Sequence, residues 1–475
     1  MTLVAAGVFA APASAAPAAP ALDWKPCGEV FEDWAAASQG DTTMDCATVA
    51  VPVDYSKPDG RKLTVAVSRL KATDPAMRKG AIVVNPGGPG GSGITYPLRL
   101  ASRGLAPLHA DFDLISFDPR GVGYSDRIDC DVDFHADPPP TATDQEFLTA
   151  VFDANAKFNE QCAAKDPGFV HQLTTANVAR DVDSIRAAMG EQKIGFYGAS
   201  WGTALGAEYQ TLFDSHVSAM WLDSVMPPSM NLAAMDDDVA NVREKRAAQF
   251  FDWLSRHDAE YHFGTAAAAV RAKLFALRDE LAKNPREAGD TYYNGRSVGD
   301  LMISSVEGFT DAATSLAELQ EGGTPQGPAP ARATTQRRFG ADDGFDSFNV
   351  LQYNAVMCND GTGSRDANEI WADVQRRVRT DPVSGYRADT ALYCGSWPWA
   401  AQPWQLTPGH SPLQLSGHLQ EDTTPYPWAV AMHKQVGGGL LTIDDDTHAS
   451  LPDRPCAQQA IDFFHTGRPQ NGECR

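Results

Sequence analysis

The stretch from Gly198 to Gly202 limits what this chain can fold into more than any other. It has the sequence Gly-Ala-Ser-Trp-Gly, follows a short apolar run at 193–197 and precedes a segment of helix-forming composition at 203–209. A serine between a strand and a helix in this pattern lies on a sharp turn, with its hydroxyl held at the edge of a sheet. The stretch therefore predicts Ser200 as a nucleophile. The alternative is an ordinary glycine-rich turn with a capping serine.

Segments upstream of this turn favour a parallel sheet around it. An apolar strand pattern at 80–85 leads into Pro-Gly-Gly-Pro-Gly-Gly at 86–91, where backbone N–H groups could face a developing oxyanion. A second apolar strand pattern at 112–117 leads into Asp-Pro-Arg-Gly-Val-Gly-Tyr-Ser at 118–125, and apolar residues at helical spacing follow up to Met189. Strands and helices that alternate in this way predict a parallel α/β sheet.

These motifs resemble those of the prolyl aminopeptidase group of α/β-hydrolases. The loop at 86–90 is similar to that group's His-Gly-Gly-Pro-Gly, with Pro86 in the place of the histidine. Residues 118–125 are similar to its D-x-R-G-x-G-x-S, and residues 197–203 to its serine turn. The cysteine-bearing extensions at both ends look like those of secreted tripeptidyl aminopeptidases. The resemblance implies an α/β-hydrolase fold, a mostly parallel central sheet with an inserted helical cap. It also implies a serine exopeptidase that releases short peptides, tripeptides by expectation, from free N-termini.

A serine enzyme of this fold needs an acid and a histidine downstream of the serine. His448 follows the apolar run 439–443, in the loop where the resemblance places the catalytic histidine, and His418 is a second choice. The acid is expected in the loop after the preceding strand. Asp422 is favoured because most triads of this fold use aspartate, and Glu421 stays open as the alternative acid. A polar loop without a catalytic role is the other interpretation of both carboxylates.

The same residues predict a reaction path. Ser200 attacks the scissile carbonyl while His448 takes its proton, and the carboxylate fixes the imidazole. The N–H of Trp201 and that of Gly88, or of its neighbour Gly87, are the expected oxyanion donors. The Cys and His spacing predicts no metal site, and we expect no cofactor.

The order of the predicted elements also gives a domain organisation. Residues 1–15 are typical of a signal peptide that ends in Ala-Ser-Ala, and 16–230 are expected to form the first part of the hydrolase core. Residues 231–405 are expected to form a mostly helical cap, and 406–475 the C-terminal part of the core. The cap should bind the substrate's α-ammonium group, for which Glu307, Glu318 and Asp360 are candidates and Asp360 is favoured. A surface carboxylate without that role is the alternative interpretation.

The cysteine content favours an exported protein. The chain contains 8 cysteines, and an even number in an exported chain suggests disulfides. Sequence alone leaves many pairings open. The simplest prediction joins neighbours along the chain, as Cys27–Cys46, Cys130–Cys162, Cys358–Cys394 and Cys456–Cys474.

The charge and the apolar content of the chain limit the kinds of partner that it can bind. A net charge of −22 argues against a nucleic-acid partner, and no apolar run beyond the N-terminus reaches the length of a membrane span. We therefore expect a secreted protein, monomeric by preference, whose partners are peptides with free N-termini. Two other classes stay open, a secreted esterase or lipase of the same fold and a non-catalytic binding protein on this scaffold.

Overall fold

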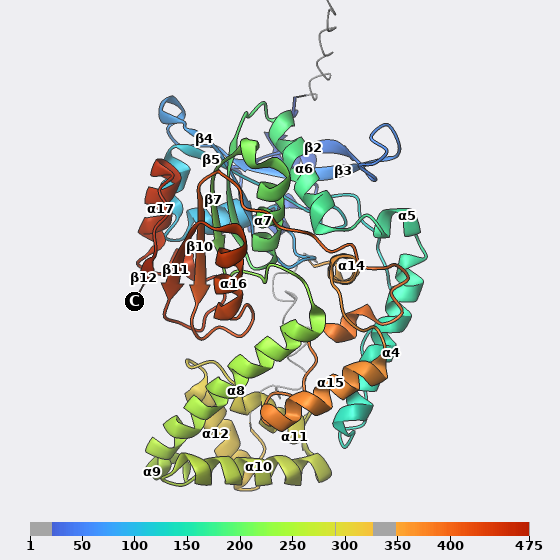
Figure 1. Cartoon of the computed structure of the whole chain (residues 1–475), viewed down its shortest axis with the longest axis vertical. Coiled ribbons are helices and arrows are strands. Elements are labelled where there is room, and N and C mark those ends of the chain that lie inside the picture. The colour runs from blue at the N-terminus through green and yellow to red at the C-terminus, as the bar shows by residue number, and fades with distance from the viewer. Residues whose placement is uncertain (1–20, 290, 326–347, 475) are drawn as a thin grey trace, which may run out of the picture.

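The computed structural model describes residues 21–289, 291–325 and 348–474, so the predicted signal peptide at 1–15 lies outside the described residues. The described chain is built around a mixed sheet that is mostly parallel, with helices packed on it (Figure 1). In order across the sheet, the strands are β1 (Lys25–Pro26), β2 (Asp45–Pro52), β3 (Lys62–Leu70), β5 (Phe112–Phe117), β4 (Gly80–Asn85), β6 (Ile194–Ala199), β7 (Val217–Asp223), β10 (Leu413–His418), β11 (Gly439–Ile443) and β12 (Gly472–Cys474).

Helices connect these strands and cover the sheet. Those that come before β7 are α1 (Cys27–Val30), α2 (Trp34–Ala37), α3 (Tyr96–Ala101), α4 (Asp144–Ala163), α5 (Pro167–Val170), α6 (Thr175–Ala188) and α7 (Trp201–Phe213). Those between β7 and β10 are α8 (Leu232–Arg256), α9 (Asp258–Tyr261), α10 (Ala267–Lys283), α11 (Gly295–Met302), α12 (Phe309–Gln320), α14 (Val350–Asp360) and α15 (Ala367–Thr380). Helices α16 (Tyr426–Val436) and α17 (Ala457–Thr466) follow β10 and β11, and a small ribbon pairs β8 (Arg286–Ala288) with β9 (Thr291–Tyr293).

The alternation of side chains along the strands divides the core into two layers. On β4, Val83 belongs to one buried cluster while Ile82 and Val84 belong to the other, because successive strand residues point to opposite faces. The first cluster includes residues of α6, α7 and α16, and the second includes residues of α3 and α17. Helices therefore cover both faces of the sheet, as the α/β prediction requires.

The parallel strands place the predicted site residues at one edge of the sheet. Strands β4, β6, β7, β10 and β11 are successive parallel neighbours, so their carboxyl ends lie at the same edge. The segments that follow them hold the glycine loop at 86–91, then Ser200, Ser224, Glu421 and His448. Residues far apart in the sequence thus meet in one region.

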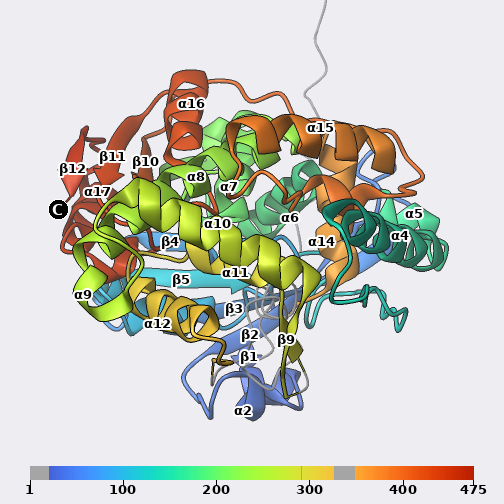
Figure 2. The same ribbon diagram turned by 90° about the horizontal axis from the view of Figure 1, so that it is seen from below.

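The long insertion between β7 and β10 packs in two ways. Helices α8 to α12 share a hydrophobic cluster of their own, with Phe250, Leu274 and Leu316 fully buried in it. Helices α14 and α15 instead add Val356 and Ile370 to the first core cluster, the one that also includes residues of α6, α7 and α16. In Figure 1 α8 to α12 gather below the sheet, and the view from below in Figure 2 shows α8, α10 and α11 crossing in front of it.

Disulfides close local segments of this fold. The cysteines are joined as Cys27–Cys46, Cys130–Cys162, Cys358–Cys394 and Cys456–Cys474, which is the predicted pairing of neighbours. Cys358–Cys394 links the C-terminal part of α14 to the segment before β10, and Cys456–Cys474 links the start of α17 to β12. Among the helices of the described ranges, none has the length and apolar content needed to cross a membrane.

Candidate active site

Ser200 lies on a strained turn between β6 and α7. Its φ is 59° and its ψ is −131°, a backbone conformation that residues other than glycine rarely adopt. Its N–H donates to the carbonyl of Asp223 at the end of β7 (3.1 Å), and its own carbonyl accepts the N–H of Thr203 (2.9 Å). The strand, turn and helix predicted around Ser200 are all present, and the turn is fastened to the neighbouring strand.

The glycines of this turn are needed because backbone crosses there. A Cβ atom at Gly198 would lie 2.3 Å from the carbonyl oxygen of Gly202, and one at Gly202 would lie 2.8 Å from the carbonyl oxygen of Asn85. Contacts under about 3 Å with backbone cannot be relieved by a side-chain rotation. The Gly-x-Ser-x-Gly spacing therefore follows from the close approach of β4, β6 and α7.

The glycine loop lies directly against the serine turn. A Cβ at Gly87, whose φ is +95°, would lie 2.7 Å from the Ser200 Cβ and 3.0 Å from the Trp201 nitrogen. The N–H of Gly87 donates to Asn85 Oδ1 (2.9 Å). Since that donor is occupied, Gly88 is the better candidate from this loop for an N–H directed at a substrate oxyanion, together with Trp201.

A methyl group at position 87 should therefore damage the reaction without removing any proposed catalytic side chain. We expect Gly87→Ala to lower kcat on the order of 100-fold, because it displaces the loop from the serine turn and disturbs the oxyanion donors. The matched control is Gly472→Ala, where an added Cβ meets nothing within 4 Å. Steady-state kinetics on an activated ester would measure the effect, and equal activity of the two variants would contradict it.

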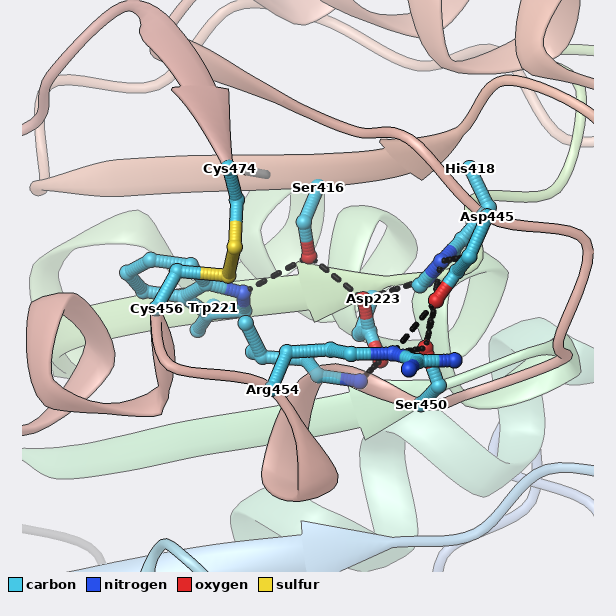
Figure 3. Close-up of a disulfide and its surroundings, with 10 residues drawn as sticks. Trp221, Asp223, Ser416, His418, Asp445, Ser450, Arg454, Cys456 and Cys474 are labelled. Atoms are coloured by element: carbon cyan, nitrogen blue, oxygen red, sulfur yellow. Dashed lines mark hydrogen bonds and ion pairs between the residues drawn. A yellow bond between two sulfur atoms is a disulfide. The ribbon is translucent and has the colours of Figure 1, made fainter.

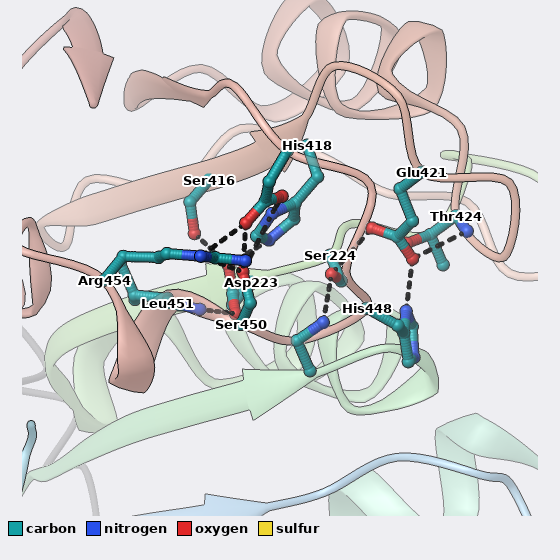
Figure 4. A network of polar contacts seen from close by, with 12 residues as sticks. Asp223, Ser224, Ser416, His418, Glu421, Thr424, His448, Ser450, Leu451 and Arg454 are labelled. Atoms are coloured by element: carbon teal, nitrogen blue, oxygen red, sulfur yellow. Dashed lines mark hydrogen bonds and ion pairs between the residues drawn. The ribbon is translucent and has the colours of Figure 1, made fainter. Parts of the chain in front are cut away.

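His448 is paired with Glu421 (Figure 4). The Nδ1 atom of His448 forms a short hydrogen bond with Glu421 Oε1, which also accepts the hydroxyl (2.7 Å) and the N–H (3.1 Å) of Thr424. Glu421 Oε2 accepts the hydroxyl of Ser224 (2.8 Å), and that hydroxyl accepts the N–H of Ala449 (2.8 Å). The carboxylate is almost fully buried, at 1% exposed, and each oxygen has a donor that fixes its orientation.

Asp422, the acid favoured from the sequence, does not fit that position. Its carboxylate faces the opposite way along the loop, where it accepts from Arg243 Nε (2.6 Å) and lies 3.3 Å from an Arg246 guanidinium nitrogen. Both arginines come from α8 and their side chains are almost buried. Asp422 is thus paired with α8, and its carboxylate has no contact with His448 among the hydrogen bonds described. The alternative acid, Glu421, is the one that bonds to His448.

The surroundings of His448 favour its charged form. Burial by itself lowers the pKa of the imidazole, but the Glu421 carboxylate outweighs it and raises the pKa of His448 above the ordinary 6.5. An imidazole held by a carboxylate at Nδ1 presents its other nitrogen as a base, and the imidazolium that forms is stabilised. This pair can therefore accept a proton from a serine hydroxyl and return it.

Asp360 is in the wrong place to bind a substrate ammonium group. It ends α14, is 2% exposed, and its carboxylate accepts the N–H of Thr175 at the start of α6 (2.9 Å). Burial raises the pKa of Asp360 to about 7. The indole N–H of Trp201 donates to the Thr175 hydroxyl (2.9 Å), so Asp360 belongs to the packing beneath the serine turn. The predicted role in substrate binding does not fit a carboxylate that a ligand cannot reach.

Two contributors to the site were missed from the sequence. Ser224 and Thr424 both donate to the Glu421 carboxylate, from the end of β7 and from the same loop. Thr424 could have been found, because a hydroxyl residue after an acid in a tight loop often bonds to it. Ser224 carries no such signal, because only the pairing of β7 with β10 brings it near Glu421.

The sheet order, the strained serine turn and the His–Glu pair at one edge of the sheet are those of a serine hydrolase of the α/β-hydrolase fold. A family model described as alpha/beta hydrolase fold matches residues 80–347, and one described as TAP-like protein matches residues 381–474. The chain is 32% identical to a tripeptidyl aminopeptidase of Streptomyces lividans, over 97% of this chain and 87% of that protein.

Other relatives carry different names. Serine protease Hip1 of Mycobacterium tuberculosis is 29% identical over 85% of this chain and 81% of its own length. A protein of the same organism named carboxylesterase B is 30% identical over 93% of this chain and 87% of its own length. The chain thus belongs to the tripeptidyl aminopeptidase group of the α/β-hydrolase family.

Proposed function

We propose that this protein is a secreted serine aminopeptidase that releases tripeptides from the free N-termini of peptides. Ser200 is the nucleophile, His448 the general base and Glu421 the acid that orients it. The observation that carries this proposal is the pairing of His448 with the buried Glu421 carboxylate at the sheet edge where Ser200 lies on its strained turn. The similarity to a tripeptidyl aminopeptidase over 97% of the chain supports the choice of substrate.

The reaction would run through an acyl-enzyme. As Ser200 Oγ attacks the substrate carbonyl, His448 takes its proton, and the N–H groups of Trp201 and Gly88 hold the oxyanion. His448 then gives the proton to the leaving amine. A water molecule attacks the acyl-enzyme with His448 again as base, which releases the short peptide and restores Ser200.

The cap supplies an alternative to Asp360 for the substrate's ammonium group. The N–H of Val306, in the segment between α11 and α12, donates to Asp446 Oδ2 (2.6 Å), in the same loop as His448. The next residue of the cap, Glu307, is exposed. A carboxylate beside the His448 loop can pair with a cation, whereas a buried one cannot be reached. Glu307 is therefore the acidic residue that we propose for this role.

Export is part of the proposal. The disulfides that join all the cysteines of the sequence favour an oxidising compartment, because such bonds are rare in reducing ones. The Ala-rich sequence at 1–15 is typical of a signal peptide.

A matched set of amide substrates tests the function. One, two or three residues on the same chromogenic amine, each with a free or an acetylated N-terminus, differ only in the feature in question. We expect the free tripeptide to give the highest kcat/KM and acetylation to lower it on the order of 100-fold, because acetylation removes the ammonium charge and the hydrogen bonds that it donates, which are worth about 1.5–3 kcal/mol each. Preference for a single residue would contradict tripeptide release.

The second candidate is a secreted esterase. The relative named carboxylesterase B favours it, and a Ser-His-Glu site does not by itself determine the leaving group. In the same assay an esterase would hydrolyse matched esters and leave every amide intact. That result would contradict the aminopeptidase proposal while it supports the serine chemistry.

A further inference from the structure

A second histidine lies beside the His448–Glu421 pair, and the proposed reaction does not use it. His418, the last residue of β10, has no exposed surface. Its Nε2 atom lies 3.1 Å from Asp223 Oδ1, and its Nδ1 atom lies 2.6 Å from Asp445 Oδ1. Figure 3 shows the imidazole between these two carboxylates, one from the end of β7 and one from the loop after β11.

Both carboxylates are held in place by further donors. Asp223 accepts the hydroxyl of Ser416 (2.5 Å), and Asp445 accepts the hydroxyl of Ser450 (2.6 Å). The guanidinium of Arg454 lies 2.6 Å from the second oxygen of Asp445 (Figure 3). The cluster is therefore a fixed arrangement of charges in which His418 is central.

His418 is charged in this environment. Burial by itself disfavours an imidazolium, but Asp223 and then Asp445 outweigh it and raise the pKa of His418 to about 10. Both ring nitrogens face carboxylate oxygens, which accept hydrogen bonds and cannot donate them when ionised. Only the imidazolium can satisfy both partners at once.

The cluster joins the segments that carry the proposed triad. His418 begins the loop that contains Glu421, and Asp445 lies in the loop that contains His448. Asp223 accepts the N–H of Ser200 through its backbone carbonyl. The imidazolium thus bridges the ends of β7, β10 and β11 behind the reacting groups.

We propose that His418 is a positioning residue, a permanent buried cation that holds the Glu421 and His448 loops together and offsets the negative charge around His448. The inference rests on the proposed roles of Ser200, His448 and Glu421. His418 itself touches neither the substrate nor the reacting atoms.

The charge effect has a definite sign. The charged groups that act on His448 are Glu421 and Asp223, which raise its pKa, and His418, which lowers it. Those that face His418 are Asp223, Asp445 and, more weakly, Glu421. Loss of the His418 cation leaves these carboxylates uncompensated, so the pKa of His448 rises and less of it is the free base in mild acid. Loss of the Asp445 carboxylate as well restores the net charge.

The experiment compares wild type, His418→Gln, Asp445→Asn and the double variant. The first readout is the pH dependence of the inactivation rate by a fluorophosphonate, whose acid limb reports His448 in the free enzyme. We expect His418→Gln to move that limb to higher pH, the double variant to return it toward the wild-type position, and Asp445→Asn to move it to lower pH. We also expect His418→Gln to lower kcat on an activated ester about tenfold, with KM little changed.

A purely structural His418 would give a different result. Variants that lose thermal stability while all four acid limbs coincide would overturn the proposal, as would a double variant that shifts like His418→Gln. If His418→Gln does not fold, Asp445→Asn decides: loss of a nearby carboxylate should move the limb to lower pH, and a limb that stays in place or moves to higher pH overturns the proposal.

A second readout separates this inference from the proposed function. Nuclear magnetic resonance of the histidine ring carbons follows the titration of His448 and His418 without any substrate. Wild-type protein that does not react with the fluorophosphonate would contradict the serine chemistry, and the ring titrations would still decide the charge effect. A His418 ring that loses its proton near neutral pH would overturn the inference even in an active enzyme.

Discussion

Replacement of Ser200 by alanine should abolish covalent catalysis while the fold stays intact. We expect kcat/KM to fall by a factor on the order of 10⁴ or more on every substrate that the wild type cleaves, because the attacking oxygen is lost. Alanine keeps the Cβ, so the strained turn with φ of 59° does not change. The melting temperature should therefore stay close to that of wild type.

The matched control is Ser229→Ala, which removes a hydroxyl from an exposed position after β7. It should retain full activity in the same assay. Mass spectrometry of protein treated with a fluorophosphonate adds a direct test, since the label should be found on Ser200 in wild type and be absent in Ser200→Ala. Undiminished turnover by Ser200→Ala would refute the proposed nucleophile.

Loss of charge at two neighbouring carboxylates of one loop should affect different properties, the activity for Glu421 and the stability of the fold for Asp422. We expect Glu421→Gln to lower kcat about 10⁴-fold, because an amide can donate to His448 Nδ1 and hold the imidazole in the wrong tautomer. We expect Asp422→Asn to change kcat little and to destabilise the fold by about 2 kcal/mol, because the almost buried Arg243 and Arg246 each lose an ion pair, although Arg243 keeps its pair with Asp389.

This pair is a sharp test, since each variant is the control for the other. Kinetics on an activated ester gives the effect on the reaction, and denaturant unfolding gives the effect on stability. A large loss of kcat in Asp422→Asn together with a small one in Glu421→Gln would return the role of acid to Asp422.

Local order in the sequence was enough to predict much of the fold. The strand, turn and helix around Ser200 are set by residues close together in the sequence, and β6 and α7 form where the sequence predicts them. The disulfides join cysteines 18 to 36 positions apart, and neighbour pairing works because each bond closes a local segment.

The site could be predicted only in part. The sequence placed His448 in the loop after β11, but it favoured Asp422 as the acid, whereas the carboxylate bonded to His448 is that of Glu421. That choice depends on which of the two residues faces the arginines of α8 and which faces His448, and α8 lies far from this loop in the chain. Asp360 shows the same limit, because its burial against Thr175 comes from packing between α14 and α6.

Patterns along the chain were sufficient to predict the class of fold, the serine on its turn and the segments from which a histidine and an acid could come. These follow from spacing along the chain, because turns, strands and local disulfides are set by near neighbours. Long-range packing, by contrast, selects the carboxylate that bonds to His448 and brings Ser224 and His418 close to that pair. Those contacts arise where β7, β10 and β11 end side by side, and the pairing of β7 with β10 joins residues 193 positions apart, such as Met220 and Leu413.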